Sequence, residues 1–301
     1  MGSSLYPSIA VIMSTYNGQK YLKQQIDSIL AQSYPNVDIV VRDDGSTDAT
    51  NDILFEYADK ENVNVIQGDN EGFCKSFCDA LQSADRSEYY AFCDQDDIWY
   101  PEKLMTAYNW ISKQCKDIPL LYYCHVREID ENGDTIGVKQ LATGSVSLPR
   151  TMTGCFGEGM AMVINRKCRD MMLEMNPENM DAHDWAASAI VLGMGKVYID
   201  EDVYADHRRL PQSVSIGSFK KKIVWFRSEL FGKNNIRMRN MEFYRCFSNR
   251  LPSDNYAIAK AFGSEKMSAV TQLKKVFYPR RWRPDILGEI AMRILMVLWK
   301  V

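Results

Sequence analysis

Short apolar runs alternate with helical stripes through the first hundred residues. Four such runs predict buried strands, at residues 8–14, 37–41, 63–66 and 89–93. Stretches with helical spacing predict helices between them, at residues 19–32, 47–59 and 72–83, and Pro101 is placed to open another helix. Strands alternating with helices form right-handed crossovers, so the pattern predicts an α/β fold with a mostly parallel central sheet.

The rest of the chain divides into an irregular middle and a helical end. Apolar runs predict strands at 120–126, 159–164 and 196–199, and helical spacing predicts helices at 166–175 and 184–192. Asn132-Gly133 predicts a hairpin turn. After residue 218 helical stripes with Lys and Arg on their polar faces dominate. The sequence therefore predicts a nucleotide-binding and catalytic domain over residues 1–218 and a helical basic region over 219–301.

Charge sharpens this division. Residues 1–218 carry 18 Lys and Arg against 33 Asp and Glu, whereas residues 219–301 carry 18 against 6. The net charge of -3 is therefore the sum of an acidic body at -15 and a basic end at +12. Such an asymmetry suggests that the two parts meet different partners.

Composition excludes several classes of protein. No run of 18 apolar residues exists, so the sequence predicts no ordinary transmembrane helix, and it shows no secretory signal pattern. The eight cysteines include no C-x-x-C pair, which favours reduced cytosolic thiols. With three histidines, a histidine-rich metal site is excluded.

Polar clusters follow the ends of the predicted strands, where open α/β sheets bind ligands. They are Thr15-Tyr16-Asn17, Asp43-Asp44-Gly45, Asn70-Glu71-Gly72 and Asp94-Gln95-Asp96-Asp97. Carboxylates as dense as those at 94–97 repel one another unless a cation or water lies among them. A solvated acidic turn is the alternative for that cluster taken alone.

The motifs together resemble glycosyltransferase family 2, whose members are inverting enzymes with the GT-A fold. The matching segments are Ser14-Thr15-Tyr16-Asn17-Gly18, the stretch from Val40 to Asp48, and Phe92 to Trp99, which includes the D-x-D motif. The resemblance covers about residues 8–215 and is strongest to bacterial rhamnosyl- and galactosyl-type transferases of cell-surface polysaccharide synthesis. It implies an inverting hexosyl- or deoxyhexosyltransferase that uses a nucleoside-diphosphate sugar.

The resemblance also implies roles for individual residues. The expected donor-binding residues are Thr15, Asn17, Asp43, Asp44, Asn70, Gly72, Asp94 and Gln95. Asp96 and His207 are expected to bind a divalent cation, Mn²⁺ or Mg²⁺, whose preferred ligands are oxygens. A surface histidine is the alternative for His207, and the sequence leaves open which of Asp43 and Asp44 contacts the base. The expected acceptor residues are Asp97, Trp99, Gly159 and Trp185.

An inverting transfer needs a general base for the acceptor hydroxyl, and Asp184 is the candidate. Asp181 is a weaker candidate, and either aspartate is also suited to an ordinary helix N-cap. Tyr204-Ala205-Asp206-His207 departs from the family's Y-R-x-H pattern at Ala205, so Arg208 or Arg209 is expected to supply any phosphate contact. The Gln212-Ser213-Val214-Ser215 loop is expected to close over the donor.

The basic end is expected to act at a membrane. Residues 286–301 are strongly apolar but too short to span a bilayer, which favours a helix lying in the membrane interface. Packing on the catalytic domain or on a second subunit, as a homo-oligomer, is the competing interpretation. No nucleic-acid module accompanies the basic helices, so nucleic acid is not an expected partner.

The sequence therefore predicts a cytoplasmic enzyme, peripheral to the inner face of the cell membrane, that transfers sugar to a saccharide or lipid-linked saccharide. Two alternatives remain at this point: a nucleotidyltransferase, and a nucleotide-sugar-binding protein without turnover. No motif in the sequence identifies the donor sugar, its base or the acceptor.

Overall fold

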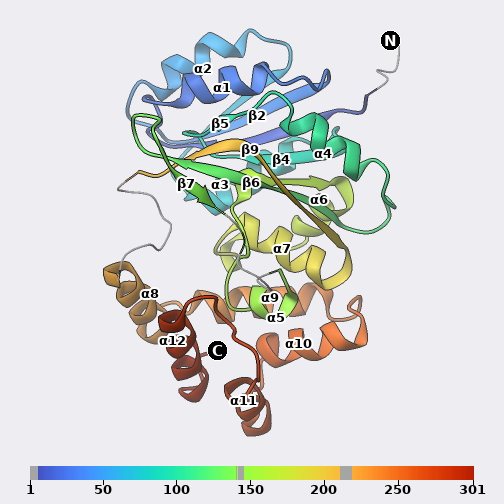
Figure 1. Ribbon diagram of the computed structural model, residues 1–301, viewed down its shortest axis with the longest axis vertical. Coiled ribbons are helices and arrows are strands. Elements are labelled where there is room, and N and C mark those ends of the chain that lie inside the picture. The colour runs from blue at the N-terminus through green and yellow to red at the C-terminus, as the bar shows by residue number, and fades with distance from the viewer. Residues whose placement is uncertain (1–5, 140, 142–145, 211–218) are drawn as a thin grey trace. The chain divides into compact units, whose positions relative to one another are not determined.

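A computed structural model describes residues 6–139, 141, 146–210 and 219–301, with no side chains described for 219–221 (Figure 1). The chain forms two compact units. Unit 1 contains residues 1–140, 157–173 and 195–211, and unit 2 contains residues 141–156, 174–194 and 212–301. Each unit is therefore made of three separate segments of the chain. The division into a catalytic domain over residues 1–218 and a basic region over residues 219–301 stays a prediction.

Unit 1 is built on a nine-stranded sheet with the order β3-β2-β1-β4-β8-β6-β9-β5, and β7 pairs with β6. The strands are β1 Ile9–Thr15, β2 Val37–Asp44, β3 Val63–Gly68, β4 Tyr89–Cys93, β5 Ile98–Trp99, β6 Leu120–Ile129, β7 Thr135–Lys139, β8 Met162–Asn165 and β9 Lys196–Arg208. Strands β1 to β4 are parallel to one another, and β6 is parallel to β9. The other pairings are antiparallel, so the parallel sheet expected from the sequence describes its first half best.

Helices cover both faces of this sheet (Figure 1). They are α1 Leu22–Leu30, α2 Thr50–Ala58, α3 Phe73–Ser83, α4 Lys103–Ile111 and α6 Arg166–Met172. Helices α1 and α2 lie on one face and α3 on the other, as right-handed crossovers require when the strand order turns back at β1. Residues 9–13 of β1 are fully buried because both faces of this strand are covered.

The apolar runs located the parallel strands within a few residues, and the structure also shows features that the pattern did not indicate. Residues 159–164 were expected to be one strand but form a 3₁₀ turn, Gly159–Ala161, followed by β8. The predicted hairpin turn is present between β6 and β7, with Gly133 at φ 94°. The prediction for Gln212-Ser213-Val214-Ser215 lies outside the described residues.

Unit 2 is helical in its described residues. Its helices are α5 Leu148–Thr151, a 3₁₀ turn at Pro177–Asn179, α7 His183–Met194, α8 Phe219–Phe231, α9 Asn235–Phe247, α10 Ser253–Gly263, α11 Ala269–Val276 and α12 Ile286–Val297. Trp185 of α7 packs edge-on against Phe243 of α9 and donates its indole N–H to the carbonyl of Thr151 at 2.7 Å. Among the described helices, none is long and apolar enough to cross a membrane.

Lys275 of α11 is an unusual member of this unit's interior. Its side chain is buried, and within the described residues its Nζ has no hydrogen-bond partner. The ammonium lies 5.0 Å from the ring centroid of Phe262. Burial, with a smaller contribution from Arg237, lowers the pKa of Lys275 to about 7. Because the unfolded chain holds this proton up to the ordinary pKa of 10.5, stability falls as the pH drops from about 10 to 7.

We therefore expect Lys275→Met to raise the free energy of unfolding at pH 7 by about 2 kcal/mol, since it removes the cost of burying an unpartnered amine. The gain should shrink at pH 10, where the native lysine is neutral. Denaturant unfolding at both pH values measures this difference. Lys274→Met, at the exposed neighbouring position, is the matched control, and an equal effect of the two substitutions would contradict the explanation.

Candidate active site

The carboxyl ends of β1 and β2 are joined through Asp43. In the parallel register Thr15 lies opposite Asp43, and its hydroxyl donates to the Asp43 carboxylate at 3.0 Å. The backbone N–H of Ser46 donates to the same carboxylate at 2.9 Å, and the Ser46 hydroxyl donates at 2.5 Å. Asp43 is buried, so these donors replace the water that its charge has lost. The two predicted donor residues Thr15 and Asp43 are thus brought together.

Asp44 organises the loop that follows β3. Its carboxylate accepts the backbone N–H groups of Glu71 and Gly72, each at 3.0 Å, and pairs with the guanidinium of Arg42. Gly72 has a φ of 88°, a left-handed conformation that suits glycine and places its N–H toward Asp44. Asn70 is exposed in the same loop. Both aspartates of the Asp43-Asp44 pair therefore hold loops in place.

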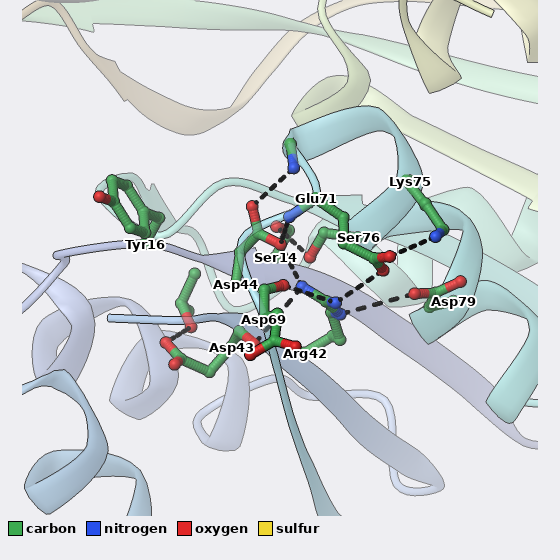
Figure 2. Close-up of polar contacts among 12 residues, drawn as sticks. Ser14, Tyr16, Arg42, Asp43, Asp44, Asp69, Glu71, Lys75, Ser76 and Asp79 are labelled. Carbon is green, nitrogen blue, oxygen red and sulfur yellow. Dashed lines mark hydrogen bonds and ion pairs between the residues drawn. The ribbon is translucent and has the colours of Figure 1, made fainter. Parts of the chain in front are cut away.

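Buried Arg42 lies at the centre of an ion cluster, shown in Figure 2, that joins buried Asp44 to the partly exposed Glu71 and Asp79. Besides Asp44, its guanidinium contacts Glu71 at 3.2 Å and Asp79 at 3.6 Å. It also donates to the carbonyl of Asp69 at 3.0 Å. Sequence reasoning missed this residue, although an arginine inside an apolar strand that ends in two aspartates is a detectable signal for such pairing.

The loop after β1 is fastened to the loops after β2 and β4. Asn17 has a φ of 50°, and its side chain accepts the N–H of Thr47 at 2.8 Å. Gln95, after β4, accepts the N–H of Tyr16 at 2.9 Å and donates to the carbonyl of Tyr16 at 3.1 Å. Tyr16 stays 47% exposed at this edge, and sequence reasoning assigned no role to it.

The Asp94–Asp97 segment places a dense negative charge beside these loops. Asp97 is buried, and burial together with Asp94 and Asp96 raises the pKa of its carboxyl well above the ordinary value. Burial also raises the pKa of Asp96, against the effect of Arg208. Asp97 accepts the N–H of Arg208 at 3.0 Å through one oxygen; within the described residues its other oxygen has no hydrogen-bond partner.

Arg208 clamps this segment from β9. Its guanidinium donates to the carbonyls of Asp96 at 2.9 Å and Asp130 at 3.1 Å, and lies 4.2 Å from the ring centroid of Tyr21. Arg209 pairs instead with Glu128 and lies 3.7 Å from Glu158. Both arginines thus have carboxylate or carbonyl partners, so the expectation that one of them contacts a phosphate stays a prediction.

A divalent cation fits the residues at this edge. His207 of β9 is largely buried, and burial lowers its pKa to about 3, so the imidazole is neutral and suited to a metal. Across the described part of the chain, no three His, Cys, Asp or Glu side chains form a group that holds a metal by itself. Mg²⁺ is typically bound by one or two carboxylates plus substrate phosphates and water, and the expectation that Asp96 and His207 bind a divalent cation stays a prediction.

The residues expected at the acceptor are mostly buried. The Trp99 ring lies in the core of unit 1, with the ammonium of buried Lys103 at 3.6 Å from its centroid. Gly159 is buried in the 3₁₀ turn, and Trp185 is buried in unit 2. Both tryptophan rings are therefore packed in the core of their units. With Asp97 also buried, the acceptor assignments stay predictions.

The two candidate bases differ in their surroundings within unit 2. Asp181 forms a two-bonded ion pair with buried Arg239, at 2.8 and 2.6 Å. Asp184 lies in the first turn of α7, partly exposed, and accepts the N–H of Trp185 at 2.6 Å. Asp181 is therefore engaged by an arginine inside unit 2, and the assignment of the base to Asp184 stays a prediction.

The Arg42 cluster yields a stability prediction. Arg42→Met should lower the free energy of unfolding by about 3 kcal/mol, because Asp44, Glu71 and Asp79 lose their shared cation. Denaturant unfolding measures the change, and Arg86→Met at an exposed position is the control. If the two variants unfold alike, the cluster does not hold the β2 and β3 loops as described.

Comparison with known proteins agrees with this geometry. The family described as Glycosyl transferase family 2 matches residues 10–153. The chain is 33% identical over 138 residues to an uncharacterized glycosyltransferase, RP339, of Rickettsia prowazekii, covering 45% of this chain and 42% of that protein. It is 28% identical over 225 residues to TuaG of Bacillus subtilis, a glycosyltransferase named for teichuronic acid biosynthesis, covering 73% of this chain and 86% of that protein. The chain spans about two fifths of the first curated relatives it matches.

Solved structures show the same fold. S. aureus TarS 1–349 in complex with UDP-GlcNAc has a TM-score of 0.56 and 18% identity, over 97% of this chain and 89% of that chain. The mannosyltransferase PcManGT of Pyrobaculum calidifontis, in complex with GDP-Man and Mn²⁺, has a TM-score of 0.55 and 16% identity, over 97% of this chain and 76% of that chain. The predicted GT-A fold is confirmed by these likenesses. Over residues 10–153, which include the strands and loops of the site, the chain matches glycosyl transferase family 2.

Proposed function

We propose that this chain transfers a sugar from a nucleoside-diphosphate sugar to a saccharide or lipid-linked saccharide acceptor, with inversion at the anomeric carbon. The observation that carries the proposal is the joined set of loops after β1, β2, β3 and β4, which ends in the Asp94–Asp97 cluster. TuaG, named for teichuronic acid biosynthesis, supports a role in making a cell-surface polysaccharide.

In the proposed complex the nucleoside lies on the loops of β1 and β2. The exposed ring of Tyr16 offers a surface for the base, and Asn17 and Asn70 offer side-chain amides. Asp43 and Asp44 already accept hydrogen bonds from the N–H groups of these loops, so we expect them to fix the loops of the donor site. Gln95 keeps Tyr16 against the segment that carries the diphosphate-facing carboxylates.

Asp94 and Asp96, together with His207 of β9, would hold a divalent cation against the diphosphate. When bound, such a cation neutralises charge on the departing diphosphate. Mn²⁺ in the PcManGT complex supports this proposal. Arg208 donates to the carbonyl of Asp96 and, through its backbone N–H, to the carboxylate of Asp97, which keeps the carboxylates from moving apart under their mutual repulsion.

The proposed transfer is one displacement. The acceptor hydroxyl oxygen forms a bond to the anomeric carbon while the bond from that carbon to the diphosphate oxygen breaks. Asp184 takes the hydroxyl proton, and the nucleoside diphosphate leaves with the bonding electron pair. Attack from the face opposite the leaving group inverts the configuration.

The first test concerns the donor. Nucleoside-diphosphate sugars with uridine, guanosine and thymidine bases are screened by thermal unfolding with Mn²⁺, since a ligand of the native state raises the melting temperature. Asp96→Asn should abolish the Mn²⁺-dependent part of that rise and reduce turnover about a hundredfold, whereas Asp52→Asn on exposed α2 should change neither. Unchanged metal dependence in Asp96→Asn would remove this carboxylate from the cation site.

The second test concerns the base. Asp184→Asn should reduce transfer about a hundredfold or more while the donor still raises the melting temperature. Asp181→Asn should lower stability, because Arg239 loses its partner, yet keep turnover in the fraction that stays folded. Wild-type transfer by Asp184→Asn would contradict the assignment. Donor binding without turnover in any saccharide or lipid extract would favour a binding protein instead.

A further inference from the structure

Helix α12 has two apolar faces, although a globular helix needs one. Met292, Leu295 and Met296 are buried in unit 2. A second set, 43–61% exposed, consists of Ile286, Leu287, Ile290, Ile294, Val297 and Leu298. At 3.6 residues per turn these six fall within about 120° of the helix circumference, which makes them one continuous stripe. We call this set the α12 stripe. Exposed apolar surface of this extent indicates a binding surface.

A groove of about 320 Å³ lies between the α12 stripe and α8. Its walls are largely apolar, including Ile223 and Phe226 of α8 and Ile290 and Ile294 of α12. Its polar lining consists of Lys222, Arg283 and Asp285, of which Lys222 and Asp285 pair at 2.8 Å. Arg283 lies 4.8 Å from the ring centroid of Trp225, and within the described residues its buried Nε has no hydrogen-bond partner.

The exposed charges of residues 222–301 are mainly cationic. Between residues 222 and 301 three of the acids, Glu229, Glu242 and Glu289, are buried, and Asp254 and Glu265 are exposed. Against these two stand nine exposed basic residues: Arg227, Lys233, Arg245, Arg250, Lys260, Lys266, Lys274, Arg280 and Arg281. Arg245 and Arg250 pair with glutamates, which leaves seven. Among the exposed side chains of residues 222–301, basic groups therefore outnumber acids.

Arg293 ties part of this charge to the α12 stripe. It lies on the helix flank next to Ile286 and Ile290 in angular position, and it donates to the carbonyls of Tyr278 at 3.0 Å and Arg280 at 3.3 Å. Its guanidinium also pairs with Glu289 at 2.6 Å, which fixes its direction. The turn that carries the exposed Arg280 and Arg281 is thereby held beside the apolar surface.

We propose that the α12 stripe and the α8–α12 groove bind the surface of an anionic phospholipid bilayer. The stripe lies at the boundary of headgroups and acyl chains, an acyl chain occupies the groove, and lipid phosphates pair with Arg280, Arg281 and Arg283. Charge complementarity identifies this occupant: a second copy of the same face would bring like charges together, whereas anionic headgroups neutralise them. The proposal goes beyond sugar transfer and does not depend on it.

Vesicle co-sedimentation of the full chain tests the proposal. The chain should bind vesicles of phosphatidylcholine mixed with phosphatidylglycerol, bind vesicles of phosphatidylcholine alone weakly, and lose binding as salt is raised. Ile290→Asp should reduce partitioning about tenfold or more, because it places a charge in the stripe. Arg280→Glu/Arg281→Glu should reduce it by a similar factor, since each basic residue near the surface contributes to attraction. Phe55→Asp, at a 78% exposed apolar position of unit 1, is the matched control and should bind as the wild type does.

Circular dichroism and thermal unfolding establish that each variant is folded, which the exposure of the substituted side chains favours. Failure of the wild-type chain to bind anionic vesicles overturns the proposal, as does unchanged binding by folded Ile290→Asp. Sedimentation velocity tests the other possible occupant, a second copy of this chain. If the wild-type chain is a dimer that does not bind vesicles, and Ile290→Asp is a monomer, the stripe is a dimer interface. That result also overturns the proposal. Sugar transfer enters none of these readouts, so their outcome is independent of the catalytic test.

Discussion

The site depends on the need of buried carboxylates for hydrogen-bond donors. Asp43 and Asp44 end an apolar strand and lose nearly all contact with water. A buried carboxylate without donors costs several kcal/mol, so the surrounding loops must turn their N–H and O–H groups inward. Ser46, Glu71 and Gly72 do so, and Arg42 adds a cation. The loops that would receive a nucleotide are therefore fixed before any ligand arrives, which reduces the ordering that binding requires.

The carboxylates after β4 differ from Asp43 and Asp44, because they lie close to one another in the sequence and their negative charges repel. Asp94, Asp96 and Asp97 crowd together, and burial raises the pKa of the last two rather than being compensated by neighbouring donors. Arg208 stabilises the backbone of the segment, but most of its guanidinium N–H groups donate to carbonyl oxygens and not to the carboxylates. The sheet edge thus holds two carboxylates, Asp43 and Asp44, whose hydrogen-bond donors shape the loops. It also holds a buried carboxylate, Asp97, one oxygen of which has no hydrogen-bond partner among the described residues.

The sequence was a good guide wherever local pattern decides structure. The first four strands and their polar ends followed from apolar runs bounded by turn residues, and the family motifs fell on those ends. The short strand β5 and the far end of β9 exist because they pair with each other, at Trp99 opposite Ala205, and no local pattern encodes that register. Burial of Trp185 is equally non-local, since it depends on Phe243, far along the chain, and on a carbonyl at Thr151. Roles at the acceptor, which depend on such burial, were therefore the least predictable.

Charge in the helical end shows how folding changes the meaning of composition. The +12 total of residues 219–301 includes acids and bases whose charges are used inside unit 2. Glu289 accepts the N–H groups of Trp282 and Arg283 and pairs with Arg293. The carboxylate of this acid therefore stabilises the basic turn. Of the cations that remain outside, Arg280 and Arg281 lie in the turn that Arg293 holds beside the exposed apolar side chains of α12. Exposure of the apolar side chains to water is unfavourable, whereas an anionic membrane interface would cover them and pair with the basic groups beside them. This combination of apolar and basic groups on one surface distinguishes unit 2 from unit 1.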